Sequence, residues 1–239
     1  MRIDRLAGNM RIVQGREVFC LNEDSVLLAN FPALRPGMSV LELGSGTGGV
    51  LLLVYLRRRG LKLTGVERDK LALKYLRKTI ELNDLSGEIS ILGMDFRELP
   101  PEFNGKFDLV LANPPFQAES GAPAPAAENK RVSRVERFGS FGDFCMAAGK
   151  LMKNRGRFVF IHKTERLAQI METLREHSLE PKQVRFIHPR AGLPAGRLLM
   201  ESIKNGGAGL TVRPPLFVYQ EKSVYTEEIA AYYPEGADA

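Results

Sequence analysis

The run SVLELGSGTGGVLLLVYL, residues 39–56, carries the strongest structural signal in this chain. Its first part is almost wholly apolar and β-prone, which indicates a buried strand of a parallel sheet. The glycines that follow let the backbone approach a ligand closely, and the apolar run after them predicts a helix with unpaired N–H groups at its start. Strand, glycine turn and helix together predict a nucleotide-type binding site at Gly44, Ser45, Gly46 and Gly48.

The glycine turn alone does not identify the nucleotide, because it also fits the G-x-G-x-x-G pattern of dinucleotide-binding folds. The next predicted strand, residues 62–66, ends in Glu67, about 20 residues on, where a carboxylate accepts hydrogen bonds from ribose hydroxyls in either kind of site. Glu42 helps to separate the two alternatives and favours S-adenosylmethionine. A carboxylate beside the turn repels a pyrophosphate, whereas it suits the ammonium and sulfonium groups of S-adenosylmethionine.

A third predicted strand, residues 89–94, ends in Asp95 and Phe96, after a helix predicted over residues 70–83. The Asp95 carboxylate can accept a hydrogen bond from the amino group of a cofactor adenine, and Phe96 can pack against the ring. The alternative is a helix-capping aspartate beside a core phenylalanine.

Residues 107–112 predict another buried strand, which Pro114 and Pro115 end because proline cannot donate to a sheet. Each proline also pushes the residue before it into an extended conformation, so Asn113 is held rigid at the carboxyl end of the strand. Open α/β sheets bind their ligands at that end. The Asn113 amide and the Pro114 carbonyl together can grip a planar amino group, and Phe116 can stack on the ring that carries it. The alternative is an ordinary turn beside a core phenylalanine.

Residues 1–36 precede this sheet and are expected to pack on its edge. Residues 10–14 and 17–21 alternate between apolar and polar side chains on either side of Gly15. This pattern predicts a β-hairpin.

A helix is predicted over residues 26–31, where Pro32 ends it. Asn22 and Asp24 precede it and suit its start as capping residues. The alternative is that both side chains face the cofactor pocket.

The composition sets broad limits on the protein. With 239 residues, 44% of them hydrophobic, the chain can form one core with appendages. No apolar run approaches the ~20 residues of a membrane helix and no secretory leader is recognisable, so a cytoplasmic protein is expected. Cys20 and Cys145 match no zinc pattern, so no metal is expected. The net charge of +6 favours a polyanionic partner such as nucleic acid.

In their order and spacing, these motifs resemble those of class I S-adenosylmethionine-dependent methyltransferases; they comprise residues 42–48, 67, 95–96 and 113–116. The last of them is similar to the Asn-Pro-Pro-aromatic motif of enzymes that methylate exocyclic or amide nitrogens. Nearly the whole chain resembles the tRNA adenine N6-methyltransferases that modify valine tRNA next to the anticodon. That wider resemblance includes residues 5–6, 12–14, 26–29, 134–136, 158–167 and much of 181–219.

The resemblance implies a Rossmann-like α/β fold in which helices cover both faces of a seven-stranded sheet. Residues 1–36 are then a short hairpin and helix extension, and residues 37–239 are the methyltransferase domain. The implied cofactor is S-adenosylmethionine and the implied partner is RNA, a tRNA. The implied cofactor site is Asp24, Glu42, Gly44, Ser45, Gly46, Gly48, Glu67, Arg68, Asp95, Phe96 and Asn113, and the implied catalytic set is Asn113, Pro114 and Phe116.

The rest of the chain accommodates this fold. The predicted elements are a helix over 141–152, a strand over 157–162, a helix over 165–178, and strands over 183–188 and 197–204. Residues 205–207, Asn-Gly-Gly, predict a hairpin turn into a last strand over 209–212 that closes the sheet.

A long stretch without regular signals, residues 117–137, follows the proline motif and carries Lys130, Arg131 and Arg134. A long loop beside a reaction centre is more often functional than structural, so these residues are expected to contact RNA phosphates. The alternative is a solvated charge run.

Other activities remain compatible with these motifs. The Asn-Pro-Pro motif also fits a ribosomal RNA guanine methyltransferase or a protein-glutamine methyltransferase. The glycine turn also fits a nucleotide-binding module without catalysis or an NAD-dependent oxidoreductase, although the chain shows no recognisable hydride-transfer pair.

Overall fold

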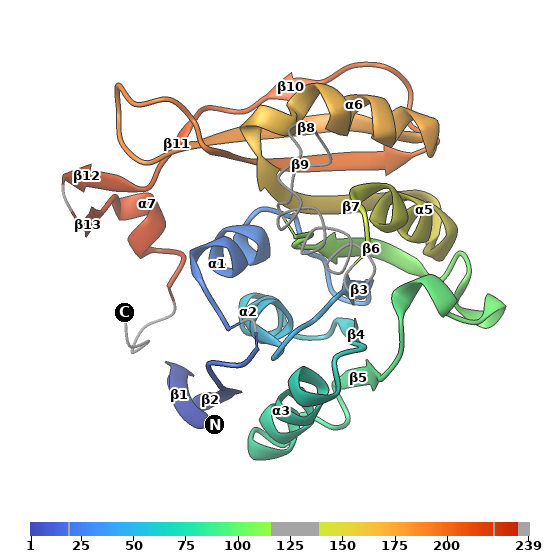
Figure 1. Cartoon of the computed structure of the whole chain (residues 1–239), viewed down its shortest axis with the longest axis vertical. Coiled ribbons are helices and arrows are strands. Elements are labelled where there is room, and N and C mark those ends of the chain that lie inside the picture. The colour runs from blue at the N-terminus through green and yellow to red at the C-terminus, as the bar shows by residue number, and fades with distance from the viewer. Residues whose placement is uncertain (19, 116–138, 222, 234–239) are drawn as a thin grey trace, which may run out of the picture.

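The computed structural model describes residues 1–18, 20–115, 139–221 and 223–233, and its central feature is one twisted sheet with nine strands (Figure 1). The strand order is β10-β8-β9-β7-β6-β3-β4-β5, and β11 also pairs with β8. These strands are β3 (Ser39–Leu43), β4 (Lys62–Val66), β5 (Ile89–Leu92), β6 (Phe107–Ala112), β7 (Met152–Lys163), β8 (Leu179–His188), β9 (Arg197–Lys204), β10 (Thr211–Val212) and β11 (Leu216–Phe217). The predicted α/β fold is confirmed; the sheet has nine strands where seven were expected, and two of them, β10 and β11, are only two residues long.

Strands β3 to β7 run parallel, and β9 runs antiparallel to both of its neighbours, β7 and β8. The chain leaves β3 toward β4 and β5 on one side and later returns to β6 on the other side. The order of the strands therefore reverses between β3 and β6, which is where open α/β sheets form a ligand crevice.

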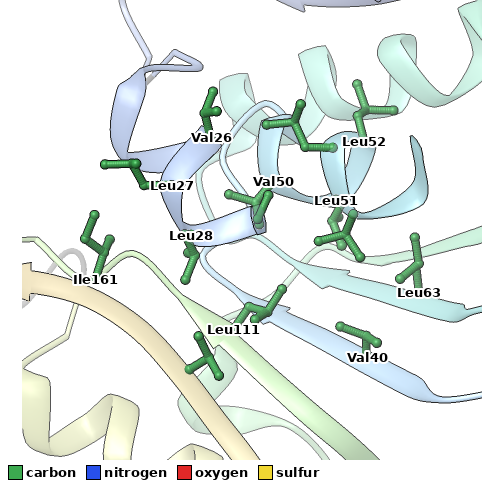
Figure 2. Packing of buried hydrophobic residues seen from close by; sticks show 14 of the residues in the cluster. Val26, Leu27, Leu28, Val40, Val50, Leu51, Leu52, Leu63, Leu111 and Ile161 are labelled. Atoms are coloured by element: carbon green, nitrogen blue, oxygen red, sulfur yellow. The ribbon is translucent and has the colours of Figure 1, made fainter. Parts of the chain in front are cut away.

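Helices cover both faces of this sheet (Figure 1). The helices α1 (Glu23–Asn30), α2 (Gly49–Arg57) and α3 (Lys70–Leu82) share one core with alternate strand residues. Figure 2 shows α1 and α2 packed on the strands through Val26, Leu27, Leu28, Val50, Leu51, Leu52, Val40, Leu63, Leu111 and Ile161. The opposite core contains α5 (Phe141–Leu151) and α6 (Leu167–Glu176).

The alternation of strand side chains assigns each residue to one core. On β6, Leu109 and Leu111 lie in the core of α1 and α2, whereas Val110 and Ala112 lie in the core of α5. This is why the apolar runs predicted from the sequence are nearly continuous, since both faces of each central strand are buried.

Capping side chains mark the starts of three helices, and α1 begins at Glu23, three residues before the predicted start, so that Asp24 lies in its first turn. The Asn22 side chain caps α1 by accepting from the Ser25 backbone N–H, and Asp69 caps α3 in the same way. Ser140 and Asp143 form a capping box at the start of α5. The smaller elements are η1 (Phe96–Glu98), η2 (Pro101–Phe103), η3 (Thr164–Arg166), β12 (Tyr219–Glu221), β13 (Val224–Tyr225) and α7 (Glu227–Ala230).

The predicted N-terminal hairpin is wrong in one of its strands. β2 (Met10–Gln14) pairs with β1 (Arg2–Ala7), around Gly8 at φ +52°, and not with residues 17–21. Leu21 is held in another way: its backbone N–H donates to Gln14 Oε1 at 2.6 Å, and its side chain lies against Gly49 at the start of α2, where a Cβ on Gly49 would come within 2.7 Å of Leu21 Cδ1.

The predicted C-terminal hairpin is also wrong. Residues 205–207 do not return the chain beside β9; the next strand, β10, pairs in parallel with β8 at the sheet edge. The physical reason is that β7 and β8 already occupy both edges of β9, so a following strand cannot pair with it. In the part of the chain that the structure describes, no helix is long and apolar enough to cross a membrane.

Candidate active site

The glycine turn connects β3 to α2 and is shaped by backbone conformations that glycine adopts most easily. Gly44, Gly46 and Gly48 have φ angles of +72°, +53° and +91°. The backbone N–H groups of Gly44 and Ser45 donate to the Val66 carbonyl, at 2.9 and 3.0 Å. The turn is therefore fixed to the end of β4, as the sequence pattern predicts for a ligand-binding turn.

The two sides of this turn differ in how closely they are packed. A Cβ on Gly48 would lie 2.5 Å from Cδ1 of Leu76, so α3 presses directly on the turn at this point. A Cβ on Gly44 would meet no atom within 4 Å. The open space beside Gly44 is where ligand atoms can approach the backbone.

Glu67 lies next to the turn at the end of β4 and is bonded to it. Its Oε2 accepts from the Gly46 N–H at 2.8 Å, and its Oε1 accepts from the Asp69 N–H at 2.6 Å. Burial raises the pKa of this carboxyl, while the N–H groups of Asp69 and Gly46 oppose the rise. Each carboxylate oxygen has further lone pairs, so Glu67 keeps acceptor capacity for a ligand hydroxyl.

Glu42 lies deeper, with 3% of its surface exposed, at the base of the same turn. Its Oε2 is buried and has no hydrogen-bond partner among the described residues. Burial raises the pKa of this carboxyl well above its ordinary value, and the neighbouring Glu67 raises it further, whereas the Leu51 N–H acts in the opposite direction. A cationic ligand group placed beside Glu42 would favour its ionised form.

Asp95 and Phe96 follow β5, which ends at Leu92, two residues before the end of the strand predicted over 89–94. Asp95 caps η1 through the Arg97 N–H and holds the side chains of Arg97 and Arg68, each at 2.6 Å. The hydrogen bond from Arg97 holds the pKa of Asp95 below its usual range, against the effect of burial. Phe96 is buried against Phe144, with ring centroids 4.5 Å apart. The capping and core roles foreseen as the alternative are thus present in the structure.

Asn113 follows β6, the strand next to β3. Its Nδ2 is buried and lacks a hydrogen-bond partner among the described residues. Pro114 is buried and Pro115 is exposed. Phe116, the last residue of the motif, lies outside the described residues, as do Lys130, Arg131 and Arg134. Buried amide groups without partners are rare in folded proteins, so the Asn113 amide needs a binding partner that the described chain does not provide.

The strand register brings the predicted residues to one edge of the sheet. Leu43 is aligned with Val66 on one side and with Ala112 on the other. Gly44, Glu67 and Asn113 each come directly after one of these strand ends. They are therefore neighbours at the carboxyl edge, at the point where the strand order reverses.

Asp24 lies at the start of α1 and its Oδ1 pairs with Nη1 of Arg197, the first residue of β9. Glu23 pairs with the same arginine through Oε1. Sequence reasoning identified Asp24 but missed Arg197, because a single arginine at the start of a strand carries no signal without its position in space. Arg97 was also missed, although its spacing of two residues from Asp95 is typical of a local capping contact.

The described residues contain no group of three or more His, Cys, Asp and Glu side chains arranged to hold a metal ion. Within the described chain, the candidate site contains the glycine turn, the buried carboxylates of Glu42 and Glu67, and the Asn113 side chain.

Comparison with known proteins identifies the family. The methyltransferase small domain family matches residues 9–176 of the chain. The chain belongs to this family. The match covers the glycine turn, both buried carboxylates and the Asn-Pro-Pro motif, so the resemblance to methyltransferases stated above is confirmed.

Proteins with curated descriptions are similar over most of this chain. One, from Parabacteroides distasonis, is described as a tRNA1(Val) (adenine(37)-N6)-methyltransferase and is 25% identical over 178 residues, 74% of each chain. Another with this description, from Trichodesmium erythraeum, is 26% identical over 195 residues, 81% of each chain. Ribosomal RNA small subunit methyltransferase C of Aeromonas hydrophila is 30% identical over 128 residues, which are 54% of this chain and 35% of that relative.

Solved structures share the fold. An Agrobacterium tumefaciens protein described as a predicted O-methyltransferase superposes with a TM-score of 0.71 at 24% identity, covering 88% of this chain and 95% of the other. TrmN from Thermus thermophilus superposes with a TM-score of 0.55 at 22% identity, covering 75% of this chain and 48% of the other. At this level of identity, the superpositions establish the methyltransferase architecture of the sheet.

Proposed function

We propose that this methyltransferase transfers a methyl group from S-adenosylmethionine to the exocyclic amino group of an adenine in tRNA, next to the anticodon of a valine tRNA. The observation that carries the proposal is the Asn113 side chain, whose buried Nδ2 has no partner within the described chain and which lies one strand away from the glycine turn. A target amino group and a cofactor bound at these two places are held at one edge of the sheet.

The residues of the glycine turn fit S-adenosylmethionine. The space beside Gly44 is open, and the turn presents backbone N–H groups at the start of α2. Glu67 has acceptor capacity for ribose hydroxyls, and the unpaired Glu42 Oε2 suits a cationic group. When bound, the cofactor supplies an electrophilic methyl group on a sulfonium.

The remaining cofactor contacts follow from the neighbouring strand ends. We assign the adenine end of the cofactor to Arg68, Asp95 and Phe96, and further contacts to Asp24, Ser45, Gly46, Gly48 and Asn113. Asp95 already holds two arginines, so an adenine amino group would use the remaining lone pairs of its carboxylate.

The chain itself orients the target base. The Asn113 Oδ1 and the Pro114 carbonyl accept the two hydrogen bonds of the amino group, which raises the electron density on its nitrogen. The prolines keep both acceptors in place, so positioning provides most of the rate enhancement. Phe116 is assigned to stack on the base, and solvent water takes the proton that the amino group loses.

The assignment to RNA is supported by two observations. Relatives similar over most of their length carry tRNA adenine methyltransferase descriptions, and the chain has a net charge of +6. Lys130, Arg131 and Arg134 follow the Asn-Pro-Pro motif and are assigned to phosphate contacts.

Substituting Asn113 by Ala tests the role of the amide. Methyl transfer to unmodified tRNA should fall by about 100-fold or more, because the target nitrogen is no longer positioned. Calorimetry with S-adenosylhomocysteine should show a much smaller loss of cofactor affinity than of activity, because the glycine turn and Glu67 still bind the cofactor. Asn104→Ala is the matched control, since this exposed asparagine precedes β6 at the other end of the strand. A variant at Asn113 that keeps most of the activity would refute the role.

A ribosomal RNA guanine methyltransferase is the second candidate, because ribosomal RNA small subunit methyltransferase C matches 54% of this chain. Mass spectrometry of nucleosides from cells that lack the protein separates the two candidates. Loss of N6-methyladenosine from tRNA supports the first, and loss of a methylguanosine from ribosomal RNA supports the second. Restoration in vitro with labelled cofactor completes the test.

A further inference from the structure

Arg197 connects the start of α1 to the central sheet. One nitrogen of its guanidinium, Nη1, pairs with Asp24 Oδ1, and the other, Nη2, pairs with Glu23 Oε1. Tyr219 donates to Glu23 Oε2 at 3.2 Å and so holds this carboxylate from the other side. All three charged side chains are largely buried, with 11 to 26% of each exposed. Such a fork depends on the planar guanidinium, which matches two acceptors at once.

The start of α1 lies across the carboxyl edge of the sheet. On one side Leu21, which precedes the helix, lies against Gly49 directly after the glycine turn. On the other side Arg197 is aligned with Lys163, the last residue of β7. Because β6 and β7 lie between β3 and β9 in the sheet, the two contacts of this segment lie on either side of β6, the strand that precedes Asn113.

The charges at this place favour a fixed arrangement. Burial lowers the pKa of Arg197, but its bonds to Glu23 and the nearby Asp24 outweigh this effect and raise it. Removing the guanidinium would leave two partly buried carboxylates facing each other without a counter-charge. Arg197 occupies only Oδ1 of Asp24, and Oδ2 has no hydrogen bond within the described chain.

From these contacts we propose that Arg197 is a positioning residue for the cofactor: by bridging Glu23 and Asp24 it fixes the start of α1 over the pocket and aims the second oxygen of Asp24 into it. This inference rests on the proposed function, since it takes S-adenosylmethionine as the ligand of the glycine turn. Arg197 touches neither the cofactor nor the target base and acts through Asp24.

The test compares Arg197→Met and Arg197→Lys with a control, Arg185→Met. Arg185 is a comparable arginine, because its guanidinium also bridges acceptors in a buried place. It lies on β8 and bonds Glu228 at 2.6 and 2.8 Å and Tyr232 at 3.2 Å. Its cluster faces α7 and the opposite end of α1, where Asn30 donates to the Tyr232 carbonyl. Both substitutions to Met remove one buried charge and its carboxylate bonds, but only one removes the contact to Asp24.

Calorimetry with S-adenosylhomocysteine on the folded proteins gives the main result. If the start of α1 has the arrangement that binds the cofactor in only about a tenth of Arg197→Met molecules, the Kd for S-adenosylhomocysteine rises about tenfold. The KM for S-adenosylmethionine should rise with the Kd. The kcat should change little, because saturating cofactor restores the arrangement of the start of α1. Arg197→Lys keeps the charge without the fork and should lie between wild type and Met. Arg185→Met should match the wild-type Kd, although its thermal stability falls.

The outcomes separate the inference from the function on which it rests. If wild type binds S-adenosylhomocysteine and Arg197→Met binds it equally well while losing thermal stability, Arg197 is only structural and the inference is overturned. If Arg185→Met weakens binding as much as Arg197→Met, the effect is general and the inference is likewise overturned. If wild type itself does not bind the compound, the proposed cofactor is wrong, and the inference is withdrawn with it.

Discussion

At the scale of single residues, Glu42 shows how depth changes the meaning of a charge. The sequence predicted a carboxylate beside the glycine turn, and the structure places it there with 3% of its surface exposed. What the sequence did not reveal is that burial and Glu67 raise its pKa, because depth depends on the packing of α2 over β3. The residue type was predictable from its position before the turn, whereas its ionisation was not.

The pH dependence of stability tests this environment. The unfolded carboxyl loses its proton near pH 4.5, whereas the folded one retains it to higher pH. Between these values the folded state binds more protons, so the free energy of unfolding falls as the pH rises. Glu42→Gln cannot ionise and so removes this dependence. The free energy of unfolding of the variant minus that of wild type should therefore increase by up to about 1.4 kcal/mol for each pH unit above pH 4.5. Urea unfolding of both proteins across a pH series measures this difference. If the two plots of unfolding free energy against pH run parallel, the raised pKa of Glu42 is contradicted.

At the scale of elements, strands and helices with strong local signals were predicted closely. β3, β4, β6 and β9 have the bounds expected from the sequence. For β3, β4 and β6 the reason is that buried parallel strands form nearly continuous apolar runs. The two hairpins failed for a different reason. In each hairpin, tertiary contacts determine which strands pair. Leu21 lies against Gly49 near the N-terminal hairpin, and both edges of β9 are already occupied at the C-terminal one. The division into an extension, residues 1–36, and a domain, residues 37–239, stays a prediction.

The attachment of the N-terminal hairpin to α3 gives a prediction at this scale. The Val13 backbone N–H, in β2, donates to Thr79 Oγ1 at 2.9 Å, and both groups are buried. Thr79→Val keeps the shape but leaves this N–H without a partner, so the free energy of unfolding should fall by about 1–3 kcal/mol. Thr79→Ser retains the hydroxyl and is the control. Equal stability of Thr79→Val and wild type in urea would show that this bond does not anchor the hairpin.

At the scale of the whole molecule, the net positive charge indicates the kind of partner, a polyanion, and says little about the fold. The sequence predicted phosphate contacts at Lys130, Arg131 and Arg134, which lie outside the described residues, so this part of the site stays a prediction. The glycine turn and the Asn-Pro-Pro motif could be located from sequence because each has a local pattern. Arg197 could not, since its role depends on a partner 173 residues away.

Replacing Lys130, Arg131 and Arg134 together by Ala should weaken tRNA binding and reduce its salt dependence. Three lost phosphate contacts lower the slope of log K against log salt by roughly 2. The control replaces Arg35, Lys62 and Lys106, which are exposed near the amino ends of strands, at the edge opposite the site. Filter binding across a salt series compares the two. An unchanged slope in the first variant would exclude these residues as phosphate ligands.

The C-terminal segment that reaches Glu23 through Tyr219 also contains a row of stacked rings. Tyr219 lies on Tyr225 and Tyr225 on Tyr233, each pair with centroids 5.3 Å apart. The chain has no tryptophan and six tyrosines, so half of its tyrosines meet at the seam between the first helix and residues 219–233. Ultraviolet emission from the unlabelled protein therefore reports on that seam, with no brighter chromophore to mask it.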